Sequence, residues 1–485
     1  MALGLSPLEI VNKGKYPLLS KAEHWERVNL SEIADVQNGF AFKSKCFSDT
    51  RGIPLVRIRD ITKDSTEHNY TGEFSKDYLL KNGDLLVGMD GDFLASKWRG
   101  NKALLNQRVC RIKPKSPFYD ERFLFLVLQP YLNAVNEETS SVTVKHLSSK
   151  TIEDLPLPLP PVFEQRRILA KVEELLSDLD KASESLTLAR KQLNVYRQAV
   201  LKQAFEGKLT AKWREENADQ LESADEISEH IMQEREAQYE ERLPYWEQAV
   251  QLWKSNGSKG RKPTRLKQKP FAEISSEELG VLPKQPKGHL YTYLSNIGDL
   301  GRGKSKHRPR NDPKLFGGQY PFLQTAEVKA ADRIIKEYNQ TYNDVGLDQS
   351  FLWPKGTLCI TIAANIAETA FLGFDACFPD SVVGFTASPN LVLPEYVELF
   401  IKAIRVRIEE YAPATAQKNI NLTTLENLVI PICSLGEQTA LVDCVERVLS
   451  NITENEKEIE RALRQSELLR QSILKKAFSG ELVPQ

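Results

Sequence analysis

One segment of the chain matches a phosphate-binding loop. Residues 298–305 read GDLGRGKS, which fits the pattern G-x-x-x-x-G-K-[ST], whose backbone amides and lysine cradle nucleotide phosphates. That chemistry needs a buried strand before the loop and a helix after it, so that the helix dipole faces the phosphates. The next residues are KHRPRNDPKLFGG, whose prolines and glycines prevent a helix from starting in the required place. A nucleotide-binding enzyme using Gly298–Ser305 is therefore the alternative hypothesis, and ATP binding by the isolated chain would decide it.

The same segment is strongly cationic and suits a different ligand. Six Lys or Arg residues lie within residues 302–314, with His307 among them and one acid, Asp312. Long cationic side chains on a glycine-containing loop suit contacts to DNA phosphates and guanine edges. The predicted DNA contacts of this half of the chain are Arg302, Lys304, Lys306, His307, Arg308, Arg310, Lys314, Gln324 and Lys418.

The first half of the chain carries a milder set of candidates. The run Asn106-Gln107-Arg108 offers amide and guanidinium groups that can make bidentate contacts to bases. The predicted DNA contacts here are Lys43, Lys45, Arg57, Arg59, Lys97, Arg99, Gln107, Arg108 and Lys145. For each of them the alternative is a solvated surface residue without a partner.

Patterns typical of catalysis or metal binding are missing from the sequence. The six His are scattered without metal-ligand spacing, and the six Cys form no C-x-x-C pair. There is no GxSxG, no paired-carboxylate signature and no Asn/Asp-Pro-Pro-aromatic motif of adenine methyltransferases. The sequence therefore predicts a binding protein with no catalytic residue and no metal site.

Composition limits the kind of protein further. A chain of 485 residues is too long for one domain. The net charge of −1 means that DNA binding must come from local basic patches. Without a signal-peptide pattern or a run of 18 apolar residues, we expect a cytoplasmic protein that does not bind a membrane.

The segments that position these residues occur twice in the sequence, as an internal repeat. The stretch 164–209 repeats without a gap at 437–482, and the offset in numbering, 437 − 164 = 273, continues upstream through much of both halves. Further upstream the register slips, which predicts a loop of different length. Related frames with divergent loops indicate one function carried out on two different targets.

The duplicated stretch predicts two long helices. Apolar residues recur at steps of four and three, the seam of a helix packed lengthwise on another helix. The predicted seam of the first copy is Ile168, Val172, Leu175, Leu179, Ala182, Leu186, Ala189, Leu193, Tyr196 and Val200. That of the second copy is Leu441, Val445, Val448, Ile452, Asn455, Ile459, Ala462, Ser466, Leu469 and Ile473, with Asn455 and Ser466 as polar positions. Gly207 and Gly480 stand where a left-handed residue ends a helix. A coiled-coil scaffold without DNA contact is the remaining alternative.

The chain resembles a known family over nearly its whole length. The resemblance is carried by GFAFKSKCF at 39–47, LPLPLPPVFEQRRI at 155–168, AFEGKLTAKWRE at 204–215 and the repeated AFSGEL near the C-terminus. These segments resemble the specificity (S) subunits of type I restriction-modification systems. The chain departs from that pattern in its acidic and then basic insert and in VIPI at 429–432.

The resemblance implies an α+β fold with a pseudo-two-fold internal repeat. Two strand-rich target recognition domains would be separated by two long antiparallel coiled-coil-like helices. The predicted divisions are recognition domain 1 at 1–155, spacer helix 1 at 156–210, an acidic helical insert and basic linker at 211–275, recognition domain 2 at 276–428 and spacer helix 2 at 429–485.

The resemblance also implies function and partners. Each domain would read one half of a bipartite, asymmetric site in double-stranded DNA, and the helices would set the spacer. Two modification (methyltransferase) subunits would dock on the helices, and restriction/translocase subunits would join them. The chain would be no enzyme by itself, but a non-catalytic subunit of a type I restriction endonuclease and adenine-specific DNA methyltransferase complex. It would bind no cofactor, and S-adenosylmethionine, ATP and Mg would sit on partner subunits.

Overall fold

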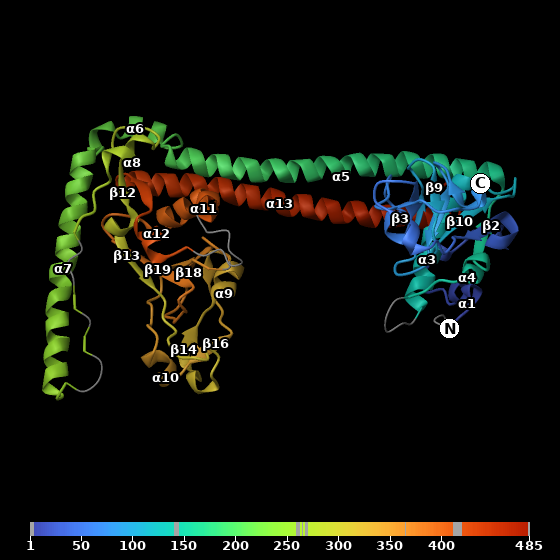
Figure 1. Ribbon diagram of the computed structural model, residues 1–485. Helices are drawn as coiled ribbons and strands as arrows, with labels where there is room; N and C mark the ends of the chain where they lie inside the picture. Colours follow the sequence, from blue (N-terminus) through green and yellow to red (C-terminus); the bar gives the residue numbers. More distant parts are fainter. Residues whose placement is uncertain are drawn as a thin grey trace. The chain divides into compact units, whose positions relative to one another are not determined.

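The computed structural model describes residues 4–139, 145–258, 262–263, 265–266, 270–363, 365–410 and 420–483. The chain forms two compact units (Figure 1). The first consists of Met1–Leu188 with Glu458–Gln485, and the second of Ala189–Lys457. Each unit therefore combines one strand-rich region with parts of both long helices. Among the described residues, no helix is both long and apolar enough to cross a membrane.

The first unit contains a four-stranded antiparallel sheet, β2-β10-β7-β8, beside a five-stranded sheet, β3-β5-β4-β9-β6, and a two-stranded pair, β1-β11. Its helices are α1 (Pro7–Asn12), α2 (Leu30–Ile33), α3 (Glu121–Glu138) and α4 (Ser149–Glu153). Its strands are β1 (Glu26–Asn29), β2 (Ala34–Asn38), β3 (Phe47–Ser48), β4 (Ile53–Val56), β5 (Asn69–Tyr70), β6 (Leu79–Leu80), β7 (Leu85–Gly88), β8 (Ala95–Lys97), β9 (Ala103–Leu105), β10 (Val109–Pro114) and β11 (Pro156–Leu159).

The second unit contains the sheet β13-β19-β17-β18-β15 and the pairs β14-β16 and β12-β20. Its helices are α6 (Ala211–Glu216), α7 (Ala224–Ser255), α8 (Ser276–Gly280), α9 (Thr325–Ala330), α10 (Asp344–Asp348), α11 (Pro394–Glu410) and α12 (Leu422–Glu426). Its strands are β12 (Leu290–Tyr293), β13 (Gly298–Arg302), β14 (Phe316–Phe322), β15 (Ile334–Ile335), β16 (Gln340–Tyr342), β17 (Leu358–Thr361), β18 (Thr369–Leu372), β19 (Val382–Ala387) and β20 (Val429–Ile432).

The two units repeat one frame, and strand pairing gives the correspondence. β1 pairs with β11 through Glu26 and Leu159, and β12 pairs with β20 through Leu290 and Ile432. The offset in numbering between the later partners is 432 − 159 = 273, and between the earlier partners it is 290 − 26 = 264. The second unit therefore holds nine additional residues between these elements, which confirms the predicted slip of register.

The additional residues fall where the two units differ in structure. Residues 39–84 of the first unit supply β3–β6 of the five-stranded sheet, whereas residues 303–357 of the second supply the hairpin-like pair β14-β16 and the short helices α9 and α10. We call these two ranges the divergent segments. Most of the predicted DNA contacts lie in them.

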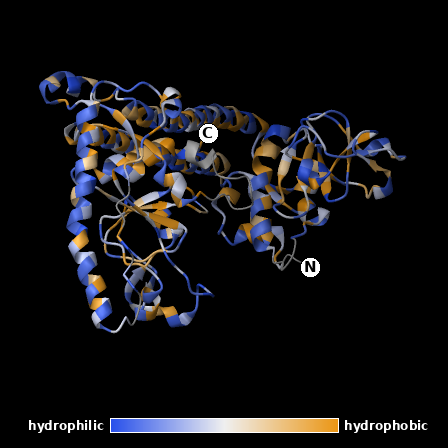
Figure 2. Cartoon of the chain, turned by 60° about the vertical axis from the view of Figure 1, so that its left-hand side comes forward, coloured by the Kyte–Doolittle hydropathy of each residue, from blue (hydrophilic) through white to orange (hydrophobic). Residues whose placement is uncertain are grey.

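The two predicted long helices are present and have equal length. Helix α5 spans Val162–Phe205 and α13 spans Leu435–Phe478, each of 44 residues. In the first unit the Ser183 and Ser466 hydroxyls lie 2.9 Å apart, and Arg470, one turn further along α13, pairs with Asp180. A later residue of α13 meets an earlier residue of α5, so the helices run antiparallel. Figure 2 shows hydrophobic residues alternating with hydrophilic ones along them.

The seam between the helices departs from the predicted heptad near its middle. The predicted seam residues Ala182, Tyr196, Asn455 and Leu469 are exposed. Ser183 faces α13 instead, and Arg197 pairs with Glu456 of α13 at 2.8 Å in the second unit. The reason is that a nearly straight helix has about 3.6 residues per turn, so a strict seven-residue repeat drifts about 20° per heptad around it.

Each long helix begins beside one strand pair and ends in the other unit. Gly207 after α5 and Gly480 after α13 have positive φ angles of 69° and 75°, which confirms the predicted helix ends. An added Cβ would meet Pro286 at Gly207 and Ala22 at Gly480. The numbers of Pro286 and Ala22 differ by the same 264 that relates β12 to β1, so the two helix ends pack on equivalent positions.

Candidate nucleic-acid interface

A buried glutamine joins the first unit to the start of its long helix. The amide nitrogen of Gln165 donates to the carbonyls of Pro160 at 2.7 Å and Phe118 at 2.9 Å. Its amide oxygen accepts from the backbone N–H of Asp120 at 2.7 Å. Three bonds from one side chain hold α5 against the turn before α3, so the orientation of the helix is fixed relative to the sheet.

The second unit repeats this arrangement atom for atom. Gln438 donates to the carbonyls of Cys433 at 2.8 Å and Leu391 at 2.9 Å, and it accepts from the N–H of Leu393 at 2.9 Å. All four residues stand at the offset of 273 from their counterparts around Gln165. In the sequence the Glu-Gln pair serves only as a mark of family resemblance. Its repetition at one offset is the available signal for this structural role.

The glutamate before each glutamine is also buried, but its partners differ. In the first unit the indole N–H of Trp25 donates to Oε2 of Glu164 at 3.1 Å, and a ring nitrogen of the half-exposed His24 lies 3.4 Å from the same oxygen. Trp25 directly precedes β1, as His289 directly precedes β12. A tryptophan in one unit therefore corresponds to a histidine in the other.

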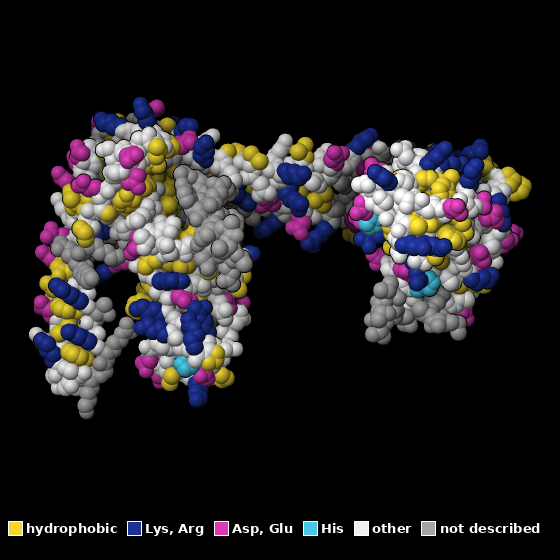
Figure 3. Space-filling model, in the orientation of Figure 1, with side chains coloured by type: hydrophobic (Ala, Val, Ile, Leu, Met, Phe, Trp, Pro, Cys, Tyr) yellow, Lys and Arg dark blue, Asp and Glu magenta, His cyan; other side chains and the backbone are white. Residues whose placement is uncertain are grey.

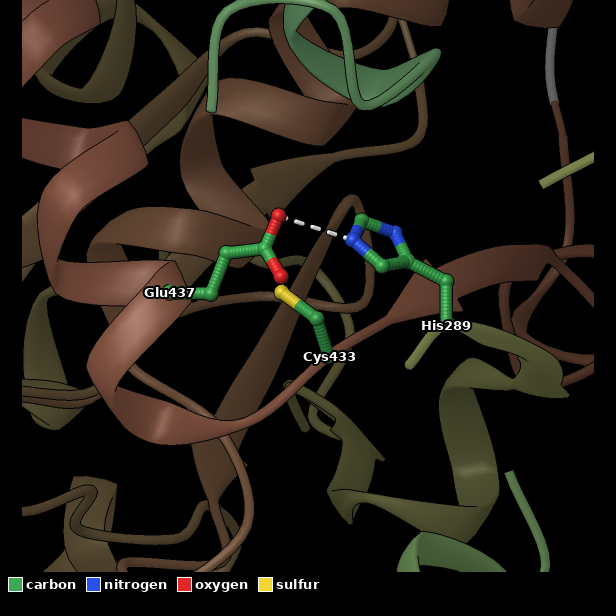
Figure 4. Close-up of side chains that lie close together, drawn as sticks. All are labelled: His289, Cys433 and Glu437. Atoms are coloured by element: carbon green, nitrogen blue, oxygen red, sulfur yellow. Dashed lines mark hydrogen bonds and ion pairs between the residues drawn. The ribbon is translucent and has the colours of Figure 1, made fainter. Parts of the chain in front are cut away.

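In the second unit Glu437 accepts from three donors, of which Figure 4 shows His289. Nε2 of His289 lies 2.9 Å from Oε1, which also accepts from the Thr210 hydroxyl at 2.6 Å and from Arg214. Burial alone raises the pKa of Glu437, but the bonds from His289 and Thr210 and the nearby charges outweigh it and hold the pKa below its ordinary value.

This cluster also brings together three possible metal ligands. Ligand atoms of His289, Cys433 and Glu437 lie within 4.8 Å of one another. The Arg214 guanidinium already binds the carboxylate, and burial raises the pKa of the Cys433 thiol well above its ordinary value. A neighbouring cation and a protonated thiol both disfavour a metal ion. We therefore interpret the cluster as a buried ion pair that holds α13.

Two of the predicted contacts in the first divergent segment are neutralised within it. Arg57 and Arg59 both lie near Glu67, at 3.2 and 3.5 Å, and Arg57 also lies 3.8 Å from the buried Asp60. Most of the Arg57 side chain is covered. These arginines hold the segment together, and DNA would have to compete with Glu67 for them.

Two further candidates also have structural partners. Lys97 lies 3.7 Å from Glu121 and 5.6 Å from the ring centre of Phe125, both on α3. Lys145 donates to the backbone carbonyl of Asn136 at 2.6 Å, near the end of the same helix. A cation at a helix C-terminus is favourable because the helix dipole is negative there.

The predicted Gln107-Arg108 pair forms the turn between β9 and β10. Arg108 has a positive φ of 70°, and its guanidinium lies 3.5 Å from Asp90 and 3.2 Å from the ring of His146. Gln107 is exposed. Among the described residues, the exposed side chains of Lys43, Lys45 and Arg99 form no ion pair.

The phosphate-loop match does not form such a loop in the second unit. Gly298–Arg302 is strand β13, paired antiparallel with β19, and Pro313–Leu315 forms a short 3-10 turn after it. Within the described stretch 298–315, the helix that a phosphate loop requires is therefore absent. Lys304 instead lies 5.9 Å from the ring centre of Phe351.

Three cations at the end of β13 and after it have partners within the second unit. Arg310 pairs with both carboxylate oxygens of Asp380 at 2.8 Å, and Arg302 donates to the carbonyl of the same residue. Arg308 donates to the carbonyl of Ser305 at 2.7 Å. These bonds give the loop a defined shape.

A histidine–aspartate pair adds to that shape. Nε2 of His307 lies 2.8 Å from Asp312. The backbone N–H of Lys314 and the His307 ring both bond to Asp312 and hold its pKa below its ordinary value. The Asp312 carboxylate is therefore ionised and offsets part of the positive charge of the loop.

Of the remaining candidates, three have exposed side chains and one lies outside the residues that the structure describes. Lys306 and Lys314 are exposed, and among the described residues their ammonium groups form no ion pair. Gln324 is exposed and donates to Gln340 at 3.2 Å. Lys418 lies outside the described residues. Figure 3 shows Lys and Arg side chains gathered on this unit over the region of β14 and β16. That these residues contact DNA stays a prediction.

These features define a duplicated recognition protein. The same arrangement of strands and long helices occurs twice, and each copy carries a different set of cationic side chains. Residues 22–191 and 294–465 both match the family described as type I restriction modification DNA specificity domain. The chain is 30% identical over 500 residues to the type I restriction enzyme EcoBI specificity subunit of Escherichia coli, an alignment that covers 100% of this chain and 92% of that protein. It is 24% identical to the EcoKI specificity subunit of E. coli strain K12, over 73% of this chain and 64% of that protein.

Solved structures share the fold. The HsdS subunit from Thermoanaerobacter tengcongensis superposes with a TM-score of 0.52 at 15% identity, over 95% of this chain and 98% of that chain. A chain from a structure on complex assembly and conformational transition of the type I R-M system gives a TM-score of 0.61 at 16% identity, over 95% and 99%.

The chain belongs to the family of type I restriction-modification specificity subunits. The predicted family, the α+β fold with its internal repeat, and the role as a non-catalytic specificity subunit that recognises DNA are thereby confirmed. The nucleotide-binding hypothesis for Gly298–Ser305 was wrong, because Gly298–Arg302 is a sheet strand and no phosphate-loop helix follows it within the described stretch 298–315.

Proposed function

We propose that each unit reads one half of a bipartite, asymmetric DNA site and that α5 and α13 set the length of the unread spacer. The observation that carries this proposal is the combination of one repeated frame with two unlike divergent segments. The frame is repeated down to the three bonds of Gln165 and Gln438. The segments differ in length, in strand arrangement and in the placement of their cations.

We also propose the partners of the chain, on the basis of its family and of apolar surface on its helices. Two methyltransferase subunits dock on this chain, and restriction/translocase subunits join the complex in the cytoplasm. S-adenosylmethionine, ATP and Mg belong to those partners. In support, exposed Leu188 and Val195 on α5 and Leu468 and Leu469 on α13 offer apolar surface outside the seam. The relatives are specificity subunits of type I restriction enzymes, and a subunit implies an assembly.

The test is to lengthen the helices without breaking their seam. Seven residues inserted after Ser183, with seven in the facing part of α13, keep the apolar face nearly in phase. They add about 10 Å of helix at about 1.5 Å per residue. A reconstituted methyltransferase complex would then select sites from a DNA library with random spacers. We expect the preferred spacer to grow by roughly three base pairs, at about 3.4 Å each. An unchanged spacer with normal methylation would contradict the role of the helices.

A further inference from the structure

The two units differ in what covers the outer side of the first strand pair and the start of the long helix. In the second unit this side is covered by α6 and α7, which belong to the insert at 211–275 (Figure 1). Ile227 and Ile231 of α7 are buried in the hydrophobic core of that unit, to which Leu391 also belongs. Trp213 of α6 lies over Gly436 at the start of α13, about 3.1 Å from where a Cβ would stand.

Polar contacts fix α7 at the same place. Arg235 donates to the carbonyl of Ser295 at 2.8 Å, and Arg242 pairs with Asp299 at 2.5 Å. Ile227, Ile231, Arg235 and Arg242 recur at steps of four, four and seven, so they lie along one face of the helix. The insert therefore presents an aliphatic stripe followed by two arginines.

The equivalent surface of the first unit has no such cover among the described residues. The counterpart of Leu391, at the offset of 273, is Phe118, whose side chain is 70% exposed. The counterpart of Gly436 is Phe163, which is 64% exposed. Gln165 donates to the carbonyl of Phe118, which holds the start of α5, where Phe163 lies, beside the turn that carries Phe118. Two large aromatic side chains exposed on one functional unit are typical of an interaction surface.

The polar anchors of α7 also have counterparts in the first unit. Ser295 and Asp299 correspond, at the offset of 264, to Ser31 and Asp35, and the Asp35 carboxylate is largely exposed beside Lys115. The nearby acids Glu26 and Glu32 are exposed as well. The surface thus has aromatic residues at its centre and carboxylates at its rim. Asp35 is paired there with Lys115 at 2.9 Å, so a basic residue of a docked helix would take the place of Lys115.

We propose that this surface, Phe118 and Phe163 with the acidic rim of Glu26, Glu32 and Asp35, docks an amphipathic helix of a methyltransferase subunit. The helix presents aliphatic residues four apart and then a basic residue, as α7 does in the second unit. The proposal rests on the proposed function, which supplies the partner. It makes the two methyltransferase positions unequal, because the chain's own insert fills the corresponding place in the second unit.

The test compares full-length chains in reconstitution with purified methyltransferase subunits. The variant is Phe118→Glu with Phe163→Glu, and the matched control is Val281→Glu, a side chain of the second unit that is 83% exposed. Stoichiometry and affinity are measured by analytical ultracentrifugation and titration. We expect the variant to bind one methyltransferase subunit normally and the other at least tenfold more weakly, since buried aromatic anchors dominate interfaces. The control binds both normally.

The outcomes separate the possible failures. If the wild-type chain binds no methyltransferase, the proposed function fails, and the docking surface with it. If wild type and variant bind two subunits equally well, only the docking surface is overturned. If the wild-type chain instead self-associates and the variant does not, the surface binds a second copy of this chain. That result would overturn the proposal that it binds a methyltransferase helix.

Discussion

The two units hold their long helices with the same glutamine geometry, but the partners of the adjacent buried glutamate differ between them. Glu164 receives a neutral indole N–H from Trp25 and meets the half-exposed His24. Glu437 is paired with Arg214, which comes from the insert that follows α5. The comparison teaches that both copies keep the bonds from the glutamine to the backbone, whereas the charged partner of the glutamate occurs in only one of them. It also gives the insert a structural role, because Arg214 ties it to α13.

The largest difference between the units is expected from removing the two carboxylate charges. In Glu437→Gln the buried Arg214 loses its counter-ion, and breaking one partner of a buried pair costs about 3–5 kcal/mol. Glu164→Gln keeps a carbonyl acceptor for Trp25 and should cost about 1 kcal/mol. Hydrogen exchange of α11 and α3, which lie in different units, reports each loss of stability separately. Equal effects would mean that the ion pair adds nothing to the second unit.

The acid sensitivity of the second unit should change with the same substitution. The pKa of Glu437 is lowered in the folded chain, so its contribution is fully present above the ordinary pKa of about 4.5. That contribution is lost as the pH falls through the lowered value. Wild-type protection of α11 should therefore decline with acid, and Glu437→Gln should flatten this decline.

A matched pair of glutamine substitutions tests the shared part of the frame. Gln165→Ala and Gln438→Ala each leave two buried carbonyls and one N–H without partners, and each should cost about 2–3 kcal/mol. Because the bonds correspond one to one, the two losses should agree within about 1 kcal/mol. Urea titrations resolved by unit give both values. A large difference would show that the common geometry is not equally important in the two units.

The divergent segments can be compared through their free cations. Lys43→Ala with Lys45→Ala alters only the first unit, and Lys306→Ala with Lys314→Ala only the second. If each lysine meets one phosphate, each double variant lowers the salt slope of DNA binding by about two. If one meets a base edge, one half of the selected site becomes less specific. Relaxation of both half-sites by one double variant would contradict two separate readers.

The smallest effect is expected in residues 4–24 before β1 of the first unit, which we call the N-terminal leader. Hydrogen bonds from Tyr16, Lys13 and Lys15 lower the pKa of Glu138 to about 2. The contribution is present above a pH of about 4.5 and is lost between there and about 2. Proteolysis of the leader should accelerate over this range in the wild type, and Glu138→Gln should show the faster rate already at neutral pH. A pH-independent rate would show that the hydrogen bonds to Glu138 are not formed in solution.

Much of the architecture follows from the sequence by itself. An unbroken offset of 273 in numbering specified two copies of one frame, and apolar spacing specified two long helices ended by Gly207 and Gly480. Such patterns are local and repeated, so they can be recognised in the sequence without knowledge of distant contacts. The slip of register was visible too, because it interrupts an otherwise continuous offset.

Other properties depended on contacts between distant parts of the chain. The pairing of Arg57 with Glu67, or of Arg310 with the sequence-distant Asp380, decides which cations are already neutralised. The drift of the helix seam depends on how straight the helices are. The correspondence of Trp25 with His289 appears only through strand register, since their sequence context differs. The sequence thus determined the repeated frame, whereas tertiary structure decided which charges and aromatic side chains remain available, because neutralisation and burial depend on residues that only folding brings together.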